Sequence, residues 1–68
     1  MKEINKSRTE IENIIDEWVH SERDRRILKL RLLDGMCFEP LAEKEDLSVR
    51  HVKNIVYKYL DKLDKKLY

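Results

Sequence analysis

Apolar and polar positions alternate with the period of an α-helix along most of this chain. Apolar residues recur every three or four positions in four separate runs, the spacing that places side chains on one face of an α-helix. The β-branched residues follow the same period, so we expect no strand. The pattern predicts an all-α fold, a compact four-helix domain in which every helix buries an apolar face.

The first predicted helix begins near residue 7 and ends at about His20. Two pairs, Ser7 with Glu10 and Thr9 with Glu12, have the capping-box spacing in which a hydroxyl and a carboxylate satisfy free backbone donors at a helix start. The apolar face consists of Ile11, Ile14, Ile15, Trp18 and Val19, and Ile4 is expected to pack beside it.

The second predicted helix spans residues 22–34. It starts after Ser21 and stops at Gly35, because glycine readily takes the left-handed conformation that ends many helices. Its apolar residues cover most of the circumference; they are Ile27, Leu28, Leu30, Leu32 and Leu33. This distribution predicts a helix at the centre of the core.

Residues 38–57 have the pattern of a helix-turn-helix. A short helix over 38–44 has Pro40 in its first turn, where the missing N–H costs little. Ser48 can then cap a last helix over 49–67. The two helices share an apolar seam of Leu41, Ala42, Leu47, Val52 and Ile55.

Length and charge narrow the class of protein. A chain of 68 residues makes one small core, so we expect residues 1–68 to form a single domain without an enclosed active-site cleft. The formal net charge is only +1, but residues 48–68 contain six Lys or Arg and two Asp. A basic recognition segment suits a nucleic-acid partner, although lysines that merely solubilise a terminal helix give the same composition.

Several function classes lack their characteristic residues. Cys37 is the single cysteine, so no internal disulfide can form, and a reducing cytoplasm is the expected location. His20, His51 and Cys37 do not have the spacing of a zinc site, and we expect neither a metal nor another cofactor. With no glycine-rich phosphate loop and no nucleophile beside a base, the chain is predicted not to be an enzyme. No apolar run resembles a signal peptide or spans a bilayer, so we expect no membrane partner.

The outward face of the last helix is the candidate site for double-stranded DNA. Its predicted DNA-binding residues are Val49, Arg50, His51, Lys53, Asn54, Tyr57 and Lys58. Arg50 can donate two hydrogen bonds to guanine and Asn54 can pair with adenine in the major groove, and Lys53 can also reach a base. The other polar members are expected to hold phosphates.

Two further surfaces have alternative interpretations. The arginines at the start of the second helix, Arg23, Arg25 and Arg26, can touch the flanking DNA backbone or pair with Glu22 or Asp24. A single module makes few DNA contacts, so a homodimer or a larger assembly is expected if binding is to be tight and specific. Its candidate surface consists of Tyr59, Leu63, Leu67 and Tyr68, which are simply core if the first helix covers them.

Residues 23–63 contain a longer pattern. It has an arginine-rich opening, the run ILKLRLLDG, the segment FEPLAE and the segment LSVRHVKN. This stretch resembles region 4 of the bacterial sigma-70 family and its small phage-borne relatives, and the VKN segment is equally similar to the LuxR-type domain. The resemblance implies that the last helix recognises a promoter element and that the domain touches RNA polymerase. It aligns Val49, Arg50 and Lys53 with base-contacting positions.

The chain departs from the sigma pattern at the turn and at one cap. Asp46 stands where glycine is usual, and Glu45 stands where an apolar residue is usual. Aspartate tolerates the left-handed conformation, so we expect the turn to survive. Cys37 replaces the usual Ser or Thr cap, which costs roughly 1 kcal/mol.

Together these patterns predict a sequence-specific DNA-binding transcriptional regulator that reads the major groove with its last helix. Two alternatives stay open. The chain can be a protein-interaction module that binds RNA polymerase or a partner regulator, or a DNA-packaging adaptor similar to terminase small subunits, which assemble into rings.

Overall fold

The computed structural model describes residues 6–67, and this part of the chain forms four α-helices and no strand. The helices are α1 (Arg8–Trp18), α2 (Glu22–Leu32), α3 (Phe38–Glu45) and α4 (Val49–Leu67). The prediction of a compact all-α four-helix domain is confirmed. The expected roles of Ile4 and Tyr68 lie outside the described residues.

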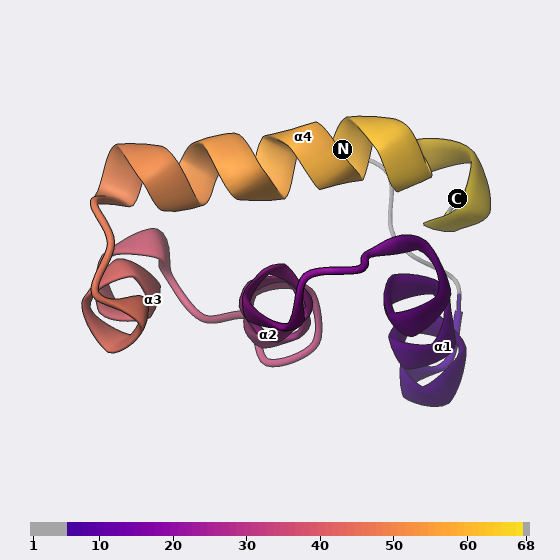
Figure 1. The fold of residues 1–68 in the computed structure, drawn as a ribbon. Coiled ribbons are helices and arrows are strands. Elements are labelled where there is room, and N and C mark those ends of the chain that lie inside the picture. The colour runs from indigo at the N-terminus through magenta and orange to yellow at the C-terminus, as the bar shows by residue number, and fades with distance from the viewer. Residues whose placement is uncertain (1–5, 68) are drawn as a thin grey trace.

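α4 lies across the other three helices (Figure 1). α2 occupies the middle and packs against α1, α3 and α4, whereas α1 and α3 do not contact each other within the described range. The central position predicted for α2 is therefore correct. Over residues 6–67, no helix combines the length and the apolar character needed to cross a membrane.

α1 begins as predicted but ends two residues early. The Glu10 backbone N–H donates to Ser7 Oγ at 3.2 Å, and the Ser7 N–H donates to Glu10 Oε1 at 3.5 Å, which completes the capping box. The helix stops at Trp18 because Val19 takes an extended conformation (φ −113°) and turns fully into the core. Arg25 then donates to the backbone carbonyls of Asp16 and Val19 near the helix end.

The core is built from all four helices and the residue after α1. Its buried members are Ile11, Ile15, Val19, Ile27, Leu28, Leu41, Ala42, Val52, Ile55, Val56, Leu63 and Leu67. Trp18 was predicted on the buried face of α1, and this prediction is wrong, because its side chain is 39% exposed. α1 uses Ile11 and Ile15 to face the core, and Trp18 is left at the boundary, where Lys66 Nζ lies 4.4 Å from its ring centroid.

Of the two interpretations given for Tyr59, Leu63, Leu67 and Tyr68, the structure agrees with the core for the members that it describes. Leu63 and Leu67 are each only 1% exposed, because they pack into the domain's own core, so these two residues cannot pair with a second chain. Tyr59 is half-buried and donates a hydrogen bond inside the domain, to Asp24.

α2 ends at Leu32, two residues before the predicted end. Gly35 has a φ of +67°, and the Met36 N–H donates to the Leu30 carbonyl at 3.1 Å, which closes a turn at the end of α2. The predicted glycine stop is correct, and the helix is shorter because Leu33 and Asp34 belong to this turn.

α3 and α4 cross steeply as a helix-turn-helix (Figure 1). α3 runs one residue beyond its predicted end, and Asp46 then takes the left-handed conformation (φ 57°, ψ 44°). The His51 N–H donates to Ser48 Oγ at 3.1 Å, so the predicted cap of α4 is present. Cys37 makes no side-chain cap bond to α3. The predicted bounds of α4 are confirmed.

Candidate nucleic-acid interface

The predicted DNA-binding residues all lie on the first three turns of α4. The exposed ones are Arg50, His51, Lys53, Asn54, Tyr57 and Lys58. Arg50, Asn54 and Tyr57 follow at i, i+4 and i+7 and therefore form one outward stripe. Val49 is half-buried and lines a shallow groove beside the first turn of α3. The candidate residues thus share one surface, with Val49 at its edge.

This part of α4 is positively charged without nearby compensation. No acidic residue occurs between Asp46 and Asp61. Within residues 6–67, every ion pair lies in the first three helices or the turn after α2; the pairs are Arg8–Glu12, Arg8–Asp34, Arg23–Asp24, Arg26–Glu45 and Lys29–Asp16. The acidic side chains of the domain are therefore partly neutralised internally, whereas the basic side chains of α4 have no ion pair within the described residues.

Phe38 forms a platform under two of the candidate residues. Lys53 Nζ lies 5.6 Å from its ring centroid, and the Tyr57 ring meets it edge-on at 5.9 Å and 65°. On the same ring, Arg31 Cζ lies 4.2 Å from the centroid, and Arg31 also donates to the Met36 carbonyl at 3.0 Å. Cation–π contacts of this kind restrict the side chains that make them. The side chains of Lys53 and Tyr57 are therefore exposed, but their contacts with Phe38 restrict their conformations.

The sequence pattern did not reveal this platform. Phe38 is half-buried at the first position of α3. Arg31, Phe38 and Lys53 come from three different helices, and the packing of α3 against both α2 and α4 brings them together. No spacing along the chain indicates that contact.

The arginines at the start of α2 make their hydrogen bonds inside the domain. Arg23 bonds to Asp24, as one of the two predicted alternatives required, and Arg25 bonds to backbone carbonyls at the end of α1. Arg26 pairs with Glu45 on α3, a partner that was not predicted. These contacts favour a structural role for the three arginines.

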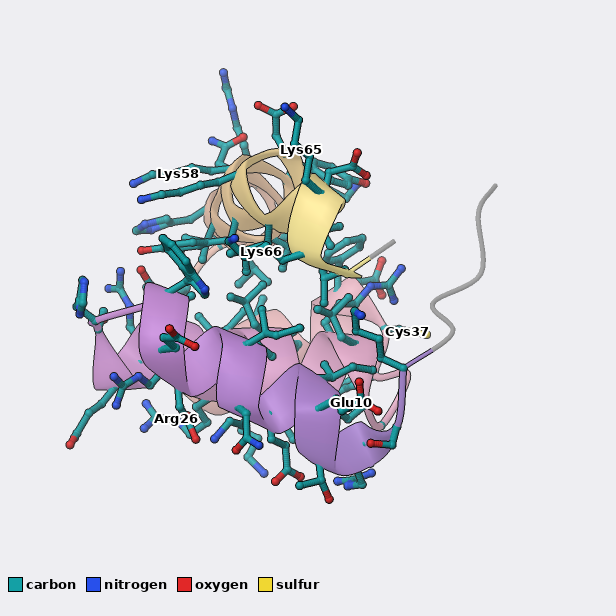
Figure 2. The ribbon with its side chains drawn as sticks, turned by 90° about the vertical axis from the view of Figure 1, so that its right-hand side faces the viewer. Glu10, Arg26, Cys37, Lys58, Lys65 and Lys66 are labelled. Carbon is teal, nitrogen blue, oxygen red and sulfur yellow. The ribbon has the colours of Figure 1, made fainter. Side chains whose placement is uncertain are left out.

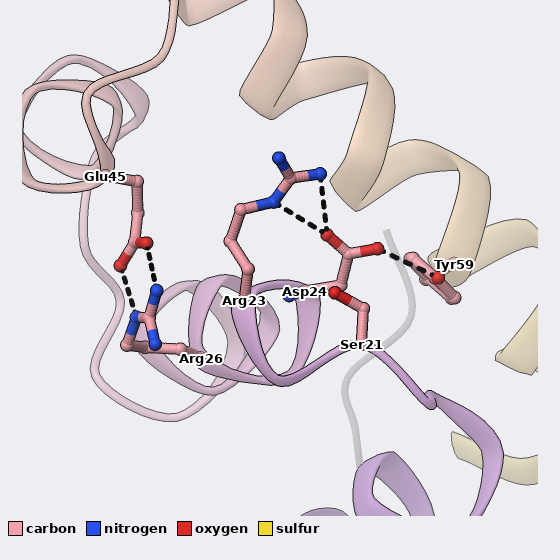
Figure 3. Close-up of polar contacts among 6 residues, drawn as sticks. All are labelled: Ser21, Arg23, Asp24, Arg26, Glu45 and Tyr59. Atoms are coloured by element: carbon pink, nitrogen blue, oxygen red, sulfur yellow. Dashed lines mark hydrogen bonds and ion pairs between the residues drawn. The ribbon is translucent and has the colours of Figure 1, made fainter.

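Arg26 and Glu45 fix α3 to α2 immediately before the helix-turn-helix turn. Arg26 donates two hydrogen bonds to the carboxylate, at 2.7 and 2.6 Å (Figure 3). These bonds lower the pKa of Glu45, although burial acts in the opposite direction, and they raise the pKa of Arg26. The charged residue at position 45 is therefore accommodated by an ion pair with a two-point geometry.

A second polar cluster fixes the middle of α4 to the start of α2. Tyr59 Oη donates to Asp24 Oδ2 at 3.0 Å, and Arg23 donates to Oδ1 at 3.3 and 3.4 Å (Figure 3). Asp24 is only 8% exposed, and its N–H donates to Ser21 Oγ. Burial, and then the bond to Asp24, raises the pKa of Tyr59. The first half of α4 is therefore fixed at its start by the turn after α3 and at its end by the hydrogen bond of Tyr59.

Compared with protein-family models, curated proteins and solved structures, the chain shows no match. The resemblance to sigma region 4 therefore stays a prediction from the sequence. What the chain binds is inferred from its own residues and their arrangement.

Proposed function

We propose that this domain is a sequence-specific double-stranded DNA-binding transcriptional regulator that reads the major groove with the first half of α4. The observation that supports this most is the charge of that half-helix. Its exposed residues include Arg50, Lys53 and Lys58, it has no acidic residue, and none of these cations is ion-paired within the described range. Unpaired cations on an exposed helix are what DNA phosphates attract.

The dimensions and residue types of α4 suit this role. A helix with its side chains is about 10–12 Å across, and the major groove is about 12 Å wide. The central stripe begins with Arg50 and Asn54, the two side chains that can form paired hydrogen bonds with guanine and adenine. Lys53, His51 and Lys58 flank this stripe, where phosphates of the groove walls would lie.

The fixed position of α4 and of its side chains also supports DNA reading. A base-reading helix must keep its register when it meets the groove, and side chains positioned by packing lose less entropy on binding. The Phe38 platform restrains Lys53 and Tyr57, and the hydrogen bond from Tyr59 to Asp24 restrains the helix itself. The resemblance to sigma region 4 points to the same face.

Fluorescence anisotropy with a labelled duplex of random sequence tests the proposal. We expect binding that weakens steeply as salt increases, because phosphate neutralisation releases counterions. Arg50→Ala should weaken binding, whereas Lys44→Ala, which removes one exposed cation from the last turn of α3, should leave it nearly unchanged. Selection of target sequences with wild type and with Arg50→Ala then tests base reading. Failure of the wild type to bind at low salt would disprove the proposed function.

A second candidate is a protein-interaction module that binds RNA polymerase or a partner regulator. The observation that favours it is Trp18, a large side chain left 39% exposed beside Lys66. Under this alternative, Trp18→Ala abolishes capture of purified RNA polymerase, whereas the double variant Arg50→Ala with Lys53→Ala retains it. Under the DNA-binding proposal the double variant loses DNA and Trp18→Ala does not.

A further inference from the structure

From Tyr57 onward, the exposed surface of α4 has two neighbouring stripes of different charge. Lys58, Lys62 and Lys65 follow at i, i+4 and i+7 and lie along one side, which we call the lysine stripe. The neighbouring stripe continues from Tyr57 through Asp61 to Asp64 at the same spacing. All of these side chains are exposed. At about 1.5 Å per residue, the lysine stripe extends along roughly 10 Å of the helix axis.

The lysine stripe is not neutralised by its neighbours. Asp61 precedes Lys65 by four residues, a spacing at which the two side chains can pair on a helix. The described part of the chain nevertheless contains no ion pair on α4. Lys58 Nζ lies 5.3 Å from the ring centroid of Tyr59, which keeps this lysine on the side of the helix away from Asp61.

Lys66 has the same charge but a different position. Its ammonium lies over the Trp18 ring, between α4 and α1, whereas Lys58 and Lys65 project from the outer side of α4 (Figure 2). The helix dipole stabilises cations in the last turn, which accounts equally for Lys65 and Lys66. It does not account for Lys58 and Lys62, which lie further from the helix end. The lysine stripe is therefore available to an anionic partner.

The partner has to lie on one side of α4 only. The central stripe of Arg50, Asn54 and Tyr57 runs into Asp61 and then Asp64, so a DNA strand that followed it would meet two carboxylates. A strand that passes over the lysine stripe meets cations along the whole length. The charge of the helix therefore selects both a side and a direction for the duplex.

Building on the proposed function, we infer that Lys62 and Lys65 extend the DNA contact beyond the reading half of α4 by binding phosphates of one strand. Lys58, Lys62 and Lys65 then follow a single strand past the groove, and Asp61 and Asp64 repel the duplex from the other side. The occupant is the backbone of the duplex that Arg50 and Asn54 read. These contacts add affinity and orientation without sequence preference.

The salt dependence of DNA binding tests this inference with a matched pair of variants. Lys62→Gln and Lys66→Gln remove the same charge from exposed positions one helical turn apart, and glutamine keeps a high helix propensity. In titrations of a labelled random duplex, Lys62→Gln should reduce the slope of log affinity against log salt by about 1, and the double variant Lys62→Gln with Lys65→Gln by about 2. Lys66→Gln should leave the slope unchanged. Target preference should be the same in all of them.

Three results would overturn the inference, and they are distinguishable from one another. Equal losses in Lys62→Gln and Lys66→Gln would mean that only net charge matters. An unchanged slope in the Lys62→Gln and Lys65→Gln double variant, with wild-type binding intact, would mean that DNA leaves α4 before Lys62. Both results leave the proposed function standing. Absence of wild-type binding at low salt would remove the proposed function and the inference together. Thermal unfolding of each variant checks that the fold is retained.

Discussion

The Glu45 carboxylate stays charged although its side chain has little contact with solvent, because Arg26 donates two hydrogen bonds to it. Its side chain is only 4% exposed, and removal of a carboxylate from water normally favours the neutral acid. Here the bonds from Arg26 outweigh that effect, and the pKa of Glu45 is lowered. The contact that holds α3 against α2 therefore depends on whether the Glu45 carboxylate is protonated.

Acid is expected to weaken the fold through this group. Because the pKa of Glu45 is lower in the folded chain than in the unfolded chain, its stabilising contribution is complete above the unfolded pKa and is lost as the pH falls through the folded pKa. Glu45→Gln should reduce the free energy of unfolding at pH 7 and should lose less than the wild type when the pH is lowered from 5 to 2. Urea titrations across this pH range measure both effects.

Glu43 provides the control for this prediction. It lies on the same helix, is exposed and has no ion pair among the described residues. Glu43→Gln should therefore leave the acid dependence close to that of the wild type. An acid dependence of Glu45→Gln that runs parallel to the wild type would show that the ion pair contributes little to stability.

Tyr59 and Tyr57 allow the same chemical change at a half-buried, hydrogen-bonded hydroxyl and at an exposed side chain. Tyr59→Phe removes the donor to Asp24 Oδ2 in a nearly buried position, and an unsatisfied group of this kind costs about 1–3 kcal/mol. Tyr57 is 56% exposed, so Tyr57→Phe should leave the free energy of unfolding almost unchanged. Chemical denaturation of the two variants measures the difference, and equal stabilities would show that Asp24 finds another partner.

At the scale of elements, the turn between α3 and α4 depends on a residue in an unusual conformation. Asp46 has positive φ, its N–H donates to the Glu43 carbonyl at 3.2 Å, and the Leu47 N–H donates to the Ala42 carbonyl at 2.9 Å. A β-branched side chain is strained there. Asp46→Val should therefore destabilise the domain by about 1–3 kcal/mol, whereas Asp46→Asn should be tolerated. Thermal unfolding measures the loss, and a stable Asp46→Val would contradict the role assigned to the turn.

Element boundaries were predictable where the signal is local. Ser48 and Asp46 set the start of α4 and the turn through their own side chains and backbone, and both were identified from the sequence. The ends of α1 and α2 were placed two residues late, because they depend on Arg25 reaching the α1 carbonyls and on the turn around Gly35. The spacing of apolar residues continues past the end of each of these helices, so it does not indicate where the helix stops.

Some features of the candidate site could be predicted from local signals, and others could not. The exposed face of α4 follows from its helical period, so the positions of Arg50 and Asn54 could be predicted. The Phe38 platform and the pairing of Arg26 with Glu45 could not, because they join residues from different helices. Trp18 was misplaced for a related reason: the period of α1 shows which residues share a face but not how far the other helices cover that face.

At the scale of the whole molecule, burial of the apolar face of the C-terminal half of α4 determines how the protein should behave in solution. Leu63 and Leu67, which suggested a dimer surface, are enclosed in the domain's own core. Trp18 and Tyr57 are the large apolar side chains exposed in the described part, and single exposed residues do not form an interface of the size that a stable homodimer requires. We therefore expect a monomer of 8.3 kDa when the protein is alone, with one or more copies recruited by DNA.

Sedimentation equilibrium across micromolar concentrations measures the mass, first without DNA and then with a short duplex. A constant monomer mass without DNA agrees with enclosure of Leu63 and Leu67, and it also counts against the ring assembly of a DNA-packaging adaptor. A dimer would contradict the prediction, and Trp18→Ala would then identify the interface: loss of the dimer places Trp18 in the contact between chains, whereas its retention points to the remaining surface. Because DNA can bring two monomers to adjacent half-sites, a dimeric complex that forms only with a duplex containing two sites is compatible with a monomeric free protein.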